Sequence, residues 1–357
     1  MQAQTLFTNT NAIFERSTPP TRKRSTDTGI ENTMSSSVAP TILCSSVFKN
    51  MRGIELFNPF KIIWSDEFFQ KEDRFSDEIV GCLCTSRFVH LIDDNFLSMM
   101  PNLKVISLHS AGIDTLDVQK MHQLNIRVAN IPHLVADTTA DMAFTLILAT
   151  ARKLKKCMKA SEHPDAKVRS YPLDGSLGTN VTGSSLGILG MGSIGYCVAK
   201  RALGFRMKTF YYNRNRRSEL DEEHVNATYC STLEELLKKS DFLVLAVPLT
   251  PETTNIIGQK ELAIMKPTSI LINVSRGHVV DTDALVDALK NSTISAAGLD
   301  VTAPEPLPLD HPLIQMDNVV LSGHTGTATA ETRSEMLKQT VKNLEAGING
   351  EPMNNEL

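Results

Sequence analysis

The sequence lacks the features that mark metal-binding or disulfide-bonded proteins. Its six cysteines are scattered, and the closest pair, Cys82 and Cys84, has the spacing of two side chains on one face of a strand rather than that of a CxxC loop. We therefore expect reduced thiols in a cytosol-like compartment. Histidines, cysteines and carboxylates form no cluster with the spacing of metal ligands, so no metal is expected.

Long hydrophobic runs and a large net charge are also missing. The most apolar stretch, residues 142–151 (MAFTLILATA), is much shorter than the roughly 18 residues that a membrane span needs, and it predicts a helix buried on most of its circumference. With 21% charged residues and a formal charge of -4 over 357 residues, the composition is typical of a globular protein with about two domains. Neither nucleic acid nor a membrane is an expected partner.

Residues 1–38 differ from the rest of the chain. They are rich in serine, threonine and basic residues and have little to bury, so we expect a disordered tail. Their composition weakly resembles a mitochondrial transit peptide, but Glu15, Asp27 and Glu31 argue against one. We expect a cytoplasmic location, with a mitochondrial one as the alternative.

From residue 40 onward, short apolar runs alternate with helical stretches, which predicts an α/β protein with parallel strands and crossover helices. A helix over about residues 137–156 and a loop over 161–184 separate two series of strands. The first series is expected at 41–46, 81–86, 103–110 and 126–131, and the second at 185–190, 207–212, 241–247, 269–274, 295–301 and 318–323. The second series fits a doubly wound nucleotide fold, in which ligands bind outside the carboxyl ends of the strands.

A glycine-rich loop lies at the start of this second series. Residues 190–195 (GMGSIG) have GxGxxG spacing directly after an apolar strand and directly before a helical pattern. The first glycine permits a tight turn, the second lets a pyrophosphate approach the backbone, and the third lets the helix pack on the strand. The residues expected to bind the cofactor here are Gly190, Met191, Gly192, Ser193, Ile194 and Gly195.

The next strand ends where a dinucleotide fold usually carries a carboxylate for the adenosine ribose. This chain has Asn213 there, followed by Arg214, Arg216 and Arg217. A carboxylate would repel a 2'-phosphate, whereas Asn213 is neutral and Arg214 offers paired donors. The pattern predicts NADP(H) in preference to NAD(H); the alternative is a solvated basic turn, and the assignment is weaker for Arg216 and Arg217.

Polar residues also follow the later strands of the series. Arg276, Asp300, Glu305 and His324 are far apart in sequence, but each comes after a predicted strand. Because the carboxyl ends of parallel strands meet at one edge, we expect these side chains to converge on the ligand crevice. His109 and His278 lie near the same segments and are expected to be bystanders.

These segments resemble the D-isomer-specific 2-hydroxyacid dehydrogenase family, and most closely its glyoxylate/hydroxypyruvate reductases. The strongest matches are VADTTADMAFTLILATARKL, AAGLDVTAPEPLP and GEPMNNEL. The resemblance implies two doubly wound parallel-sheet domains with a cleft between them, and a homodimer. A flavodoxin-like substrate domain would comprise residues 39–138 and 325–357, and a Rossmann-type nucleotide domain residues 139–324.

The resemblance also implies roles for residues of the crevice. In the reduction of a small 2-keto acid such as glyoxylate or hydroxypyruvate, His324 would donate the proton and Glu305 would orient its ring. Arg276 would hold the substrate together with the backbone amides of Ala111 and Gly112. The further cofactor contacts implied are Thr139, Val247, Pro248, Ser275, Asp300 and Gly326.

Some positions depart from the family pattern and keep other functions open. The family usually has proline before the catalytic histidine and a bulky apolar residue after it, where this chain has Gly323 and Thr325, so a looser backbone is expected. Trp64 is the only tryptophan, so those that related reductases carry near the substrate are missing. The alternatives are another member such as a phosphoglycerate dehydrogenase, a non-catalytic dinucleotide-sensing corepressor, or a degenerate enzyme.

Overall fold

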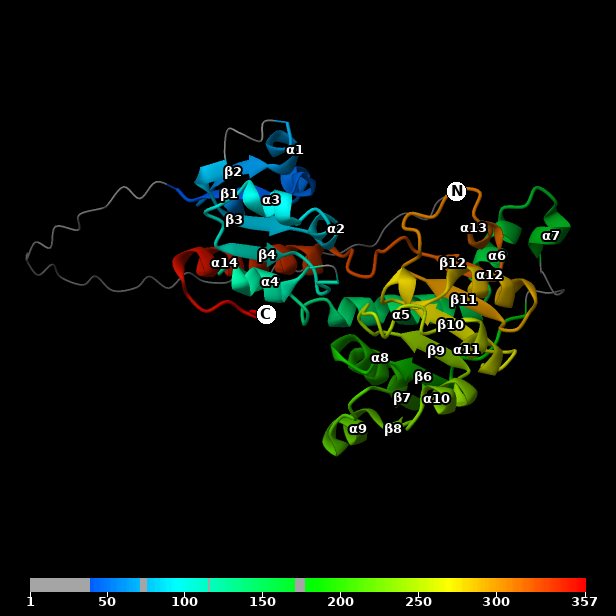
Figure 1. The fold of residues 1–357 in the computed structure, drawn as a ribbon. Helices are drawn as coiled ribbons and strands as arrows, with labels where there is room; N and C mark the ends of the chain where they lie inside the picture. Colours follow the sequence, from blue (N-terminus) through cyan, green and yellow to red (C-terminus); the bar gives the residue numbers. More distant parts are fainter. Residues whose placement is uncertain (1–38, 71–75, 115, 171–176) are drawn as a thin grey trace, which may run out of the picture. The chain divides into compact units, whose positions relative to one another are not determined.

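The computed structural model describes residues 39–70, 76–114, 116–170 and 177–357 (Figure 1). The tail predicted over residues 1–38 lies outside these ranges. Residues 39–357 form one compact unit, which contains two separate parallel sheets. The predicted α/β class with two doubly wound sheets is confirmed, while the boundaries of the two domains at residues 138, 139, 324 and 325 remain predictions.

The first sheet has five parallel strands in the order β2-β1-β3-β4-β5. This is the flavodoxin-like order 2-1-3-4-5 that the resemblance implied. The strands are β1 (Thr41–Cys44), β2 (Lys61–Trp64), β3 (Ile79–Cys84), β4 (Val105–Leu108) and β5 (Arg127–Ala129). The sequence analysis missed β2, a four-residue edge strand with only Ile63 fully buried.

The second sheet has seven parallel strands in the order β12-β11-β10-β9-β6-β7-β8. The order reverses beside β6, which creates the crevice where doubly wound folds bind dinucleotides. The strands are β6 (Ser185–Leu189), β7 (Lys208–Tyr212), β8 (Ala227–Tyr229), β9 (Phe242–Leu245), β10 (Ile270–Asn273), β11 (Ala296–Leu299) and β12 (Val319–Leu321). Six of these were predicted, and β8 was missed because its three residues at the sheet edge carry no apolar run.

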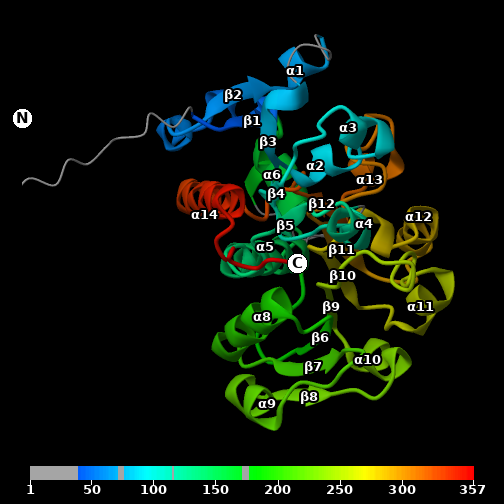
Figure 2. The same ribbon diagram turned by 60° about the vertical axis from the view of Figure 1, so that its left-hand side comes forward.

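Helices cover both faces of the second sheet. Figure 2 shows α5 and α8 on one face and α10, α11 and α12 on the other, and the apolar cores on the two faces take alternate residues of each central strand. The helices are α1 (Ser65–Phe68), α2 (Ser86–Val89), α3 (Asp94–Ser98), α4 (Val118–Gln123), α5 (Ala136–Ala151), α6 (Leu154–Ser161), α7 (Ala166–Ser170), α8 (Ser193–Gly204), α9 (Glu219–Val225), α10 (Leu233–Lys239), α11 (Gln259–Ile264), α12 (Thr282–Lys290), α13 (Pro312–Gln315) and α14 (Ala330–Asn349).

The helix predicted over residues 137–156 is two helices. Lys153 has a left-handed backbone with φ 50°, which ends α5 and starts α6 in a new direction. Most of α5 is buried between the second sheet and α8, as its apolar sequence predicted. The segment predicted as a loop over 161–184 contains α7. Within the described part of the chain, no helix has the length and apolarity of a membrane span.

The C-terminal helix α14 belongs to the first sheet, although it follows the second in sequence. Leu337, Val341 and Leu344 pack with Ile42 and Leu83 in one apolar core. Cys82 and Cys84 lie together in the core on the other face of this sheet, as their spacing predicted. All six cysteines are free thiols.

Gly347 lets α14 approach β4 closely, and this generates a prediction about stability. A Cβ atom at Gly347 would lie 2.4 Å from Cγ2 of Val105 and 2.9 Å from Sδ of Met353. We expect Gly347→Ala to lower the free energy of unfolding in urea by about 1–3 kcal/mol, because the added methyl group overpacks the core.

Gly204 in α8 provides the matched control, because a Cβ atom there would meet nothing within 4 Å. Gly204→Ala should leave the free energy of unfolding unchanged or raise it by up to about 1 kcal/mol. An equal effect of the two substitutions would contradict the close packing of α14.

Candidate active site

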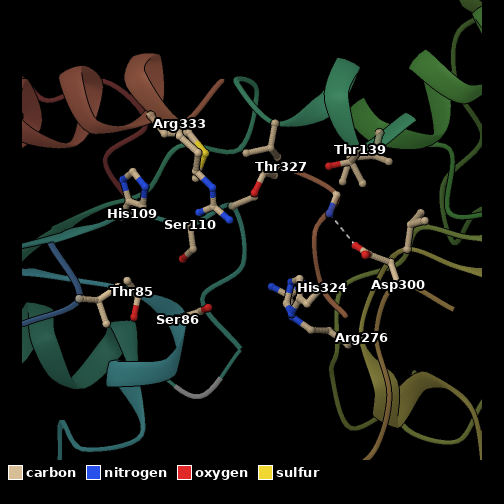
Figure 3. Close-up of a pocket in the computed structure, with 17 residues that line it drawn as sticks. Thr85, Ser86, His109, Ser110, Thr139, Arg276, Asp300, His324, Thr327 and Arg333 are labelled. Atoms are coloured by element: carbon tan, nitrogen blue, oxygen red, sulfur yellow. Dashed lines mark hydrogen bonds between the residues drawn. The ribbon is translucent and has the colours of Figure 1, made fainter. Parts of the chain in front are cut away.

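The segments that follow the strands of the two sheets meet at one pocket of about 310 Å³. Thr85, Ser86, His109, Ser110 and Ala111 follow β3 and β4 of the first sheet. Val274, Arg276, Asp300, His324, Gly326 and Thr327 follow β10, β11 and β12 of the second sheet, and further lining residues come from α8, α14, the start of α5 and Val47 after β1 (Figure 3). The predicted convergence of Arg276, Asp300 and His324 is therefore observed.

The three glycines of the loop after β6 have different surroundings. Gly190 has φ 95°, and a Cβ atom there would lie 2.6 Å from Cγ1 of Val247. A Cβ atom at Gly195 would lie 2.3 Å from the carbonyl oxygen of Gly190, so this glycine permits the contact between helix and strand. At Gly192 a Cβ atom would meet nothing within 4 Å.

The open space at Gly192 fits a dinucleotide. Gly192 is the N-cap of α8 and no side chain caps that helix, so its first backbone N–H groups are available for a pyrophosphate. Because the described neighbours of Gly192 leave room for a side chain, the protein's own packing does not demand glycine there. The space is what close approach of a phosphate requires.

Asn213, at the end of β7, is hydrogen-bonded to this glycine loop. Its Oδ1 accepts a hydrogen bond of 2.6 Å from the backbone N–H of Met191, and its Nδ2 lies 3.4 Å from the carbonyl oxygen of Met191. The side chain therefore fixes the position of the loop, and its predicted contact with the adenosine ribose remains a prediction. Met191 itself is buried.

The three arginines after Asn213 differ in whether they form ion pairs. Arg216 forms a bidentate salt bridge with Glu222, with hydrogen bonds of 2.8 Å from Nε and 2.6 Å from Nη2. Arg217 donates to the carbonyl oxygen of Met191 at 3.0 Å and pairs with Asp221 at 3.1 Å. Arg214 is exposed and makes no hydrogen bond or ion pair with any described residue, so its guanidinium is the one available to a ligand.

Tyr211 stabilises the turn over residues 213–217 through its hydroxyl group. Its hydroxyl donates to Oε1 of Glu222 and accepts a hydrogen bond of 3.0 Å from the backbone N–H of Arg217. Burial, with the hydrogen bond to Glu222, raises the pKa of Tyr211 to about 12, so the phenol stays protonated and remains a donor. Glu222 is thus shared by Tyr211 and Arg216, and the backbone that presents Arg214 is held in place.

Arg276 connects the loop after β10 to the loop after β4. Its Nε donates to Oδ2 of Asp114 at 2.6 Å, and its Nη1 donates to the carbonyl oxygen of Ser275 at 2.8 Å. The remaining nitrogen, Nη2, lies so close to Gly112 that a Cβ atom there would be 1.9 Å from it. Only glycine at position 112 leaves room for this guanidinium.

The loop of Ala111 and Gly112 has its carbonyl groups engaged. Asn130 Nδ2 donates to the carbonyl oxygen of Ala111 at 2.7 Å, and Ser110 Oγ donates to that of Gly112 at 2.8 Å. A carboxylate beside Nη2 of Arg276 would lie next to Ala111 and Gly112, whose small size allows close approach to the backbone.

His324 and Glu305 form a hydrogen-bonded pair at the pocket. Nδ1 of His324 lies 2.7 Å from Oε1 of Glu305, and because an ionised carboxylate only accepts, Nδ1 carries the proton. The other ring nitrogen, Nε2, is left for a ligand. The partner assigned to His324 by resemblance is therefore its partner in the structure.

Asp300 anchors the loop that carries His324. Its Oδ1 accepts from Ser322 Oγ and from the backbone N–H of Thr325, both at 2.7 Å, and its Oδ2 accepts from the N–H of Gly326 at 2.9 Å. Gly323 and His324 both have left-handed backbones, with φ 69° and 59°. Proline, whose φ is fixed near -65°, does not fit at position 323 in this conformation. The expected loosening of the loop is not supported, because Asp300 holds it at several points.

The other predicted residues occupy two groups. Thr139, Ile194 and Gly326 line the pocket, while Val247, Pro248 and Ser193 lie with the glycine loop at the carboxyl ends of β6 and β9. Ser275 Oγ donates to Oδ1 of Asn273 at 2.8 Å and so stabilises its own turn. His278 is not among the residues that line this pocket, and its place as a bystander remains a prediction.

Two ionisable residues of the pocket were not among the predicted site residues. His109 lines the pocket although it was expected to be a bystander, and Arg333 enters it from α14. The position of His109 just before the Ala111 loop was the only signal for it. Arg333 lies inside helix α14, and the prediction considered only residues that follow the carboxyl ends of strands. Among the described residues no group of side chains has the arrangement of a metal site.

Comparison with known proteins agrees with this geometry. Residues 144–326 match the family model described as D-isomer specific 2-hydroxyacid dehydrogenase, NAD binding domain. A glyoxylate reductase of Thermococcus litoralis is 45% identical over 263 residues, which are 73% of this chain and 78% of that protein. Glyoxylate/hydroxypyruvate reductase B of Pectobacterium atrosepticum is 42% identical over 268 residues, 74% of this chain and 82% of that protein.

A solved structure is similar over almost the whole described chain. The NADPH-dependent glyoxylate/hydroxypyruvate reductase of Sinorhizobium meliloti, in complex with NADP and malonate, has a TM-score of 0.78 and 26% sequence identity. The match covers 90% of this chain and 97% of that chain.

The surroundings of Gly192 and Gly195 generate a prediction about dinucleotide binding. We expect Gly192→Val to leave the melting temperature nearly unchanged and to weaken dinucleotide binding at least about tenfold, because the side chain fills the space for the pyrophosphate. Gly195→Val is the control, and it should lower the melting temperature, because its Cβ would lie 2.3 Å from the carbonyl oxygen of Gly190. Fluorescence titration with NADPH and thermal unfolding measure the two effects. Unchanged affinity in Gly192→Val would place the dinucleotide elsewhere.

Proposed function

Since the chain belongs to the D-isomer-specific 2-hydroxyacid dehydrogenase family, we propose that it is an NADP(H)-dependent reductase of small 2-keto acids. Glyoxylate and hydroxypyruvate are the proposed substrates, and glycolate and D-glycerate the products. One observation carries the proposal: Arg276 and the pair of His324 with Glu305 face the same pocket, which the loop of residues 190–195 adjoins through Ile194.

Binding of the substrate is assigned to Arg276 and the loop of Ala111 and Gly112. Asp114 and Ser275 hold two sides of the guanidinium, so Nη2 stays aimed at Gly112. The keto acid's carboxylate would accept hydrogen bonds from Nη2 and from backbone N–H groups of the loop. Such an arrangement fixes the orientation of the keto carbon before the reaction.

Proton transfer is assigned to Nε2 of His324. When bound, the reduced nicotinamide would supply a hydride to the keto carbon, and negative charge would grow on the carbonyl oxygen. Protonated His324 would donate its Nε2 proton to that oxygen, while Glu305 stabilises the imidazolium through Nδ1. Arg276 adds a positive charge beside the same oxygen, which stabilises the transition state electrostatically.

The preference for NADP(H) is assigned to Arg214. Arg216 and Arg217 form ion pairs with carboxylates, whereas Arg214 is exposed in the turn after β7 and forms no hydrogen bond or ion pair with a described residue. Asn213 adds no negative charge beside a 2'-phosphate. The remaining cofactor contacts, from Thr139, Val247, Pro248, Ser275, Asp300 and Gly326, stay part of the proposal.

Two further features belong to the proposal. We propose a homodimer, supported by exposed apolar side chains that gather on neighbouring helices α5 and α6, namely Leu148, Leu154 and Met158. A cytoplasmic location is proposed from the free thiols.

A substrate panel tests the reaction. Purified protein is mixed with NADPH or NADH and with glyoxylate, hydroxypyruvate, pyruvate or phosphohydroxypyruvate, and loss of absorbance of the reduced nicotinamide is followed. We expect His324→Gln to lower kcat by about 10²–10⁴-fold with little change in NADPH affinity, because only the proton donor is lost. A kcat near that of the parent protein would assign the proton to another group. No oxidation with any acid would favour the dinucleotide-sensing binding protein.

Arg214 generates a separate prediction about cofactor choice. Arg214→Ala should lower kcat/KM for NADPH by about 10- to 100-fold and leave the value for NADH nearly unchanged, because one charge-assisted pair to the 2'-phosphate is removed. Arg216→Gln is the matched control, since Arg216 is engaged by Glu222, and its ratio of NADPH to NADH efficiency should stay constant. If the parent protein prefers NADH, this role of Arg214 is wrong.

A further inference from the structure

The proposed reaction leaves two ionisable side chains of the pocket without a role, His109 and Arg333. His109 follows β4 and is only 4% exposed, with its ring packed edge-on against Phe48 at 5.1 Å between centroids. Arg333 lies in the first turns of α14. Figure 3 shows both at one end of the pocket, with Arg276 and His324 at the other.

Hydrogen bonding fixes the tautomer of His109. Its Nδ1 lies 3.2 Å from Oγ1 of Thr340, and the single hydroxyl proton of Thr340 is donated to the carbonyl oxygen of Met336 at 2.7 Å. Thr340 therefore accepts from His109, and Nδ1 carries the proton. The lone pair of the neutral ring is on Nε2.

Nε2 of His109 is a buried acceptor without a partner among the described residues. Burial, and then the charge of Arg333, lowers the pKa of His109 to about 4, so the ring is neutral near pH 7. A buried polar atom left unpaired destabilises the folded protein. His109 is one of the residues that line the pocket, so a ligand there is the candidate for the missing donor.

Arg333 supplies the complementary group. Its guanidinium is half-buried at the pocket and has no hydrogen bond or ion pair with any residue in the described ranges. Arg276 and His324, in contrast, each have a carboxylate partner. This end of the pocket thus presents donors from Arg333 and one acceptor from His109.

A hydroxyl group matches this pair of side chains. Its oxygen accepts from the guanidinium, and its proton is donated to Nε2. A carboxylate or phosphate would satisfy Arg333 but would meet the lone pair of Nε2, and an apolar group would satisfy neither. Ala111, two residues after His109, lines the same pocket, so the loop assigned to the substrate carboxylate borders this pair of side chains.

Building on the proposed function, we infer that His109 and Arg333 form a subsite for the hydroxyl group of a 3-hydroxy-2-keto acid. These residues would then determine specificity, since they favour hydroxypyruvate over an acid of the same carbon skeleton that lacks the hydroxyl. The apolar side chains of Val135, Ile194 and Met336 form the rest of this wall.

A comparison of hydroxypyruvate with pyruvate tests the subsite, because the two acids differ only in this hydroxyl. In His109→Leu, kcat/KM for hydroxypyruvate should fall by about 10- to 100-fold, while the values for pyruvate and glyoxylate stay within about threefold. Arg333→Met should have the same selective effect. If the leucine variant does not fold, His109→Gln, which keeps an acceptor, should retain a clearer preference for hydroxypyruvate than Arg333→Met.

Lys338→Met is the matched control, since Lys338 lies on the same helix, is exposed and pairs with Glu335, and its substrate preference should not change. Equal loss for hydroxypyruvate and pyruvate, or no loss for either, would overturn the subsite while leaving the reductase function intact. A preference for phosphohydroxypyruvate that Arg333→Met abolishes would overturn the hydroxyl assignment in favour of an anion. A parent protein that reduces no 2-keto acid would overturn the proposed function and this inference together.

Discussion

The buried carboxylate of Asp300 holds the arrangement on which the site depends. It lies at the end of β11 and accepts hydrogen bonds from Ser322, Thr325 and Gly326. Those bonds stabilise the left-handed backbone of Gly323 and His324 and place the imidazole where Glu305 reaches Nδ1. A left-handed histidine has a conformational cost, and it persists where surrounding contacts determine it.

Charge in the pocket is distributed unevenly between its two ends. At one end, Arg276 and His324 are matched by Asp114 and Glu305, so their positions are fixed at little electrostatic cost. At the other, Arg333 lacks a carboxylate partner among the described residues, beside the unpaired Nε2 of His109. The first end is organised for chemistry before any ligand arrives, whereas the second is complete only with a ligand.

The sequence predicted which strand-end residues meet at the pocket, but it did not predict every element of the fold. Arg276, Asp300 and His324 were found because parallel strands bring their carboxyl ends to one edge. The strands β2 and β8 were missed because edge strands need little apolar sequence, and the break at Lys153 has no glycine or proline to signal it. Which of Arg214, Arg216 and Arg217 is available to a ligand depends on their ion pairs, and the spacing in the sequence does not reveal those pairs. His109 was dismissed because its unpaired nitrogen is visible only when Thr340, from the far end of the chain, is beside it.

The return of α14 to the first sheet has a consequence for synthesis of the protein. Strands β1 and β3 are synthesised well before Leu337, Val341 and Leu344, which cover their apolar face. The seven-stranded sheet is formed by one continuous segment, residues 185–321, and has all its strands before α14 exists. The nascent chain therefore carries an uncovered apolar surface around Ile42 and Leu83 until α14 emerges, and during that interval it presents a surface for chaperones to bind.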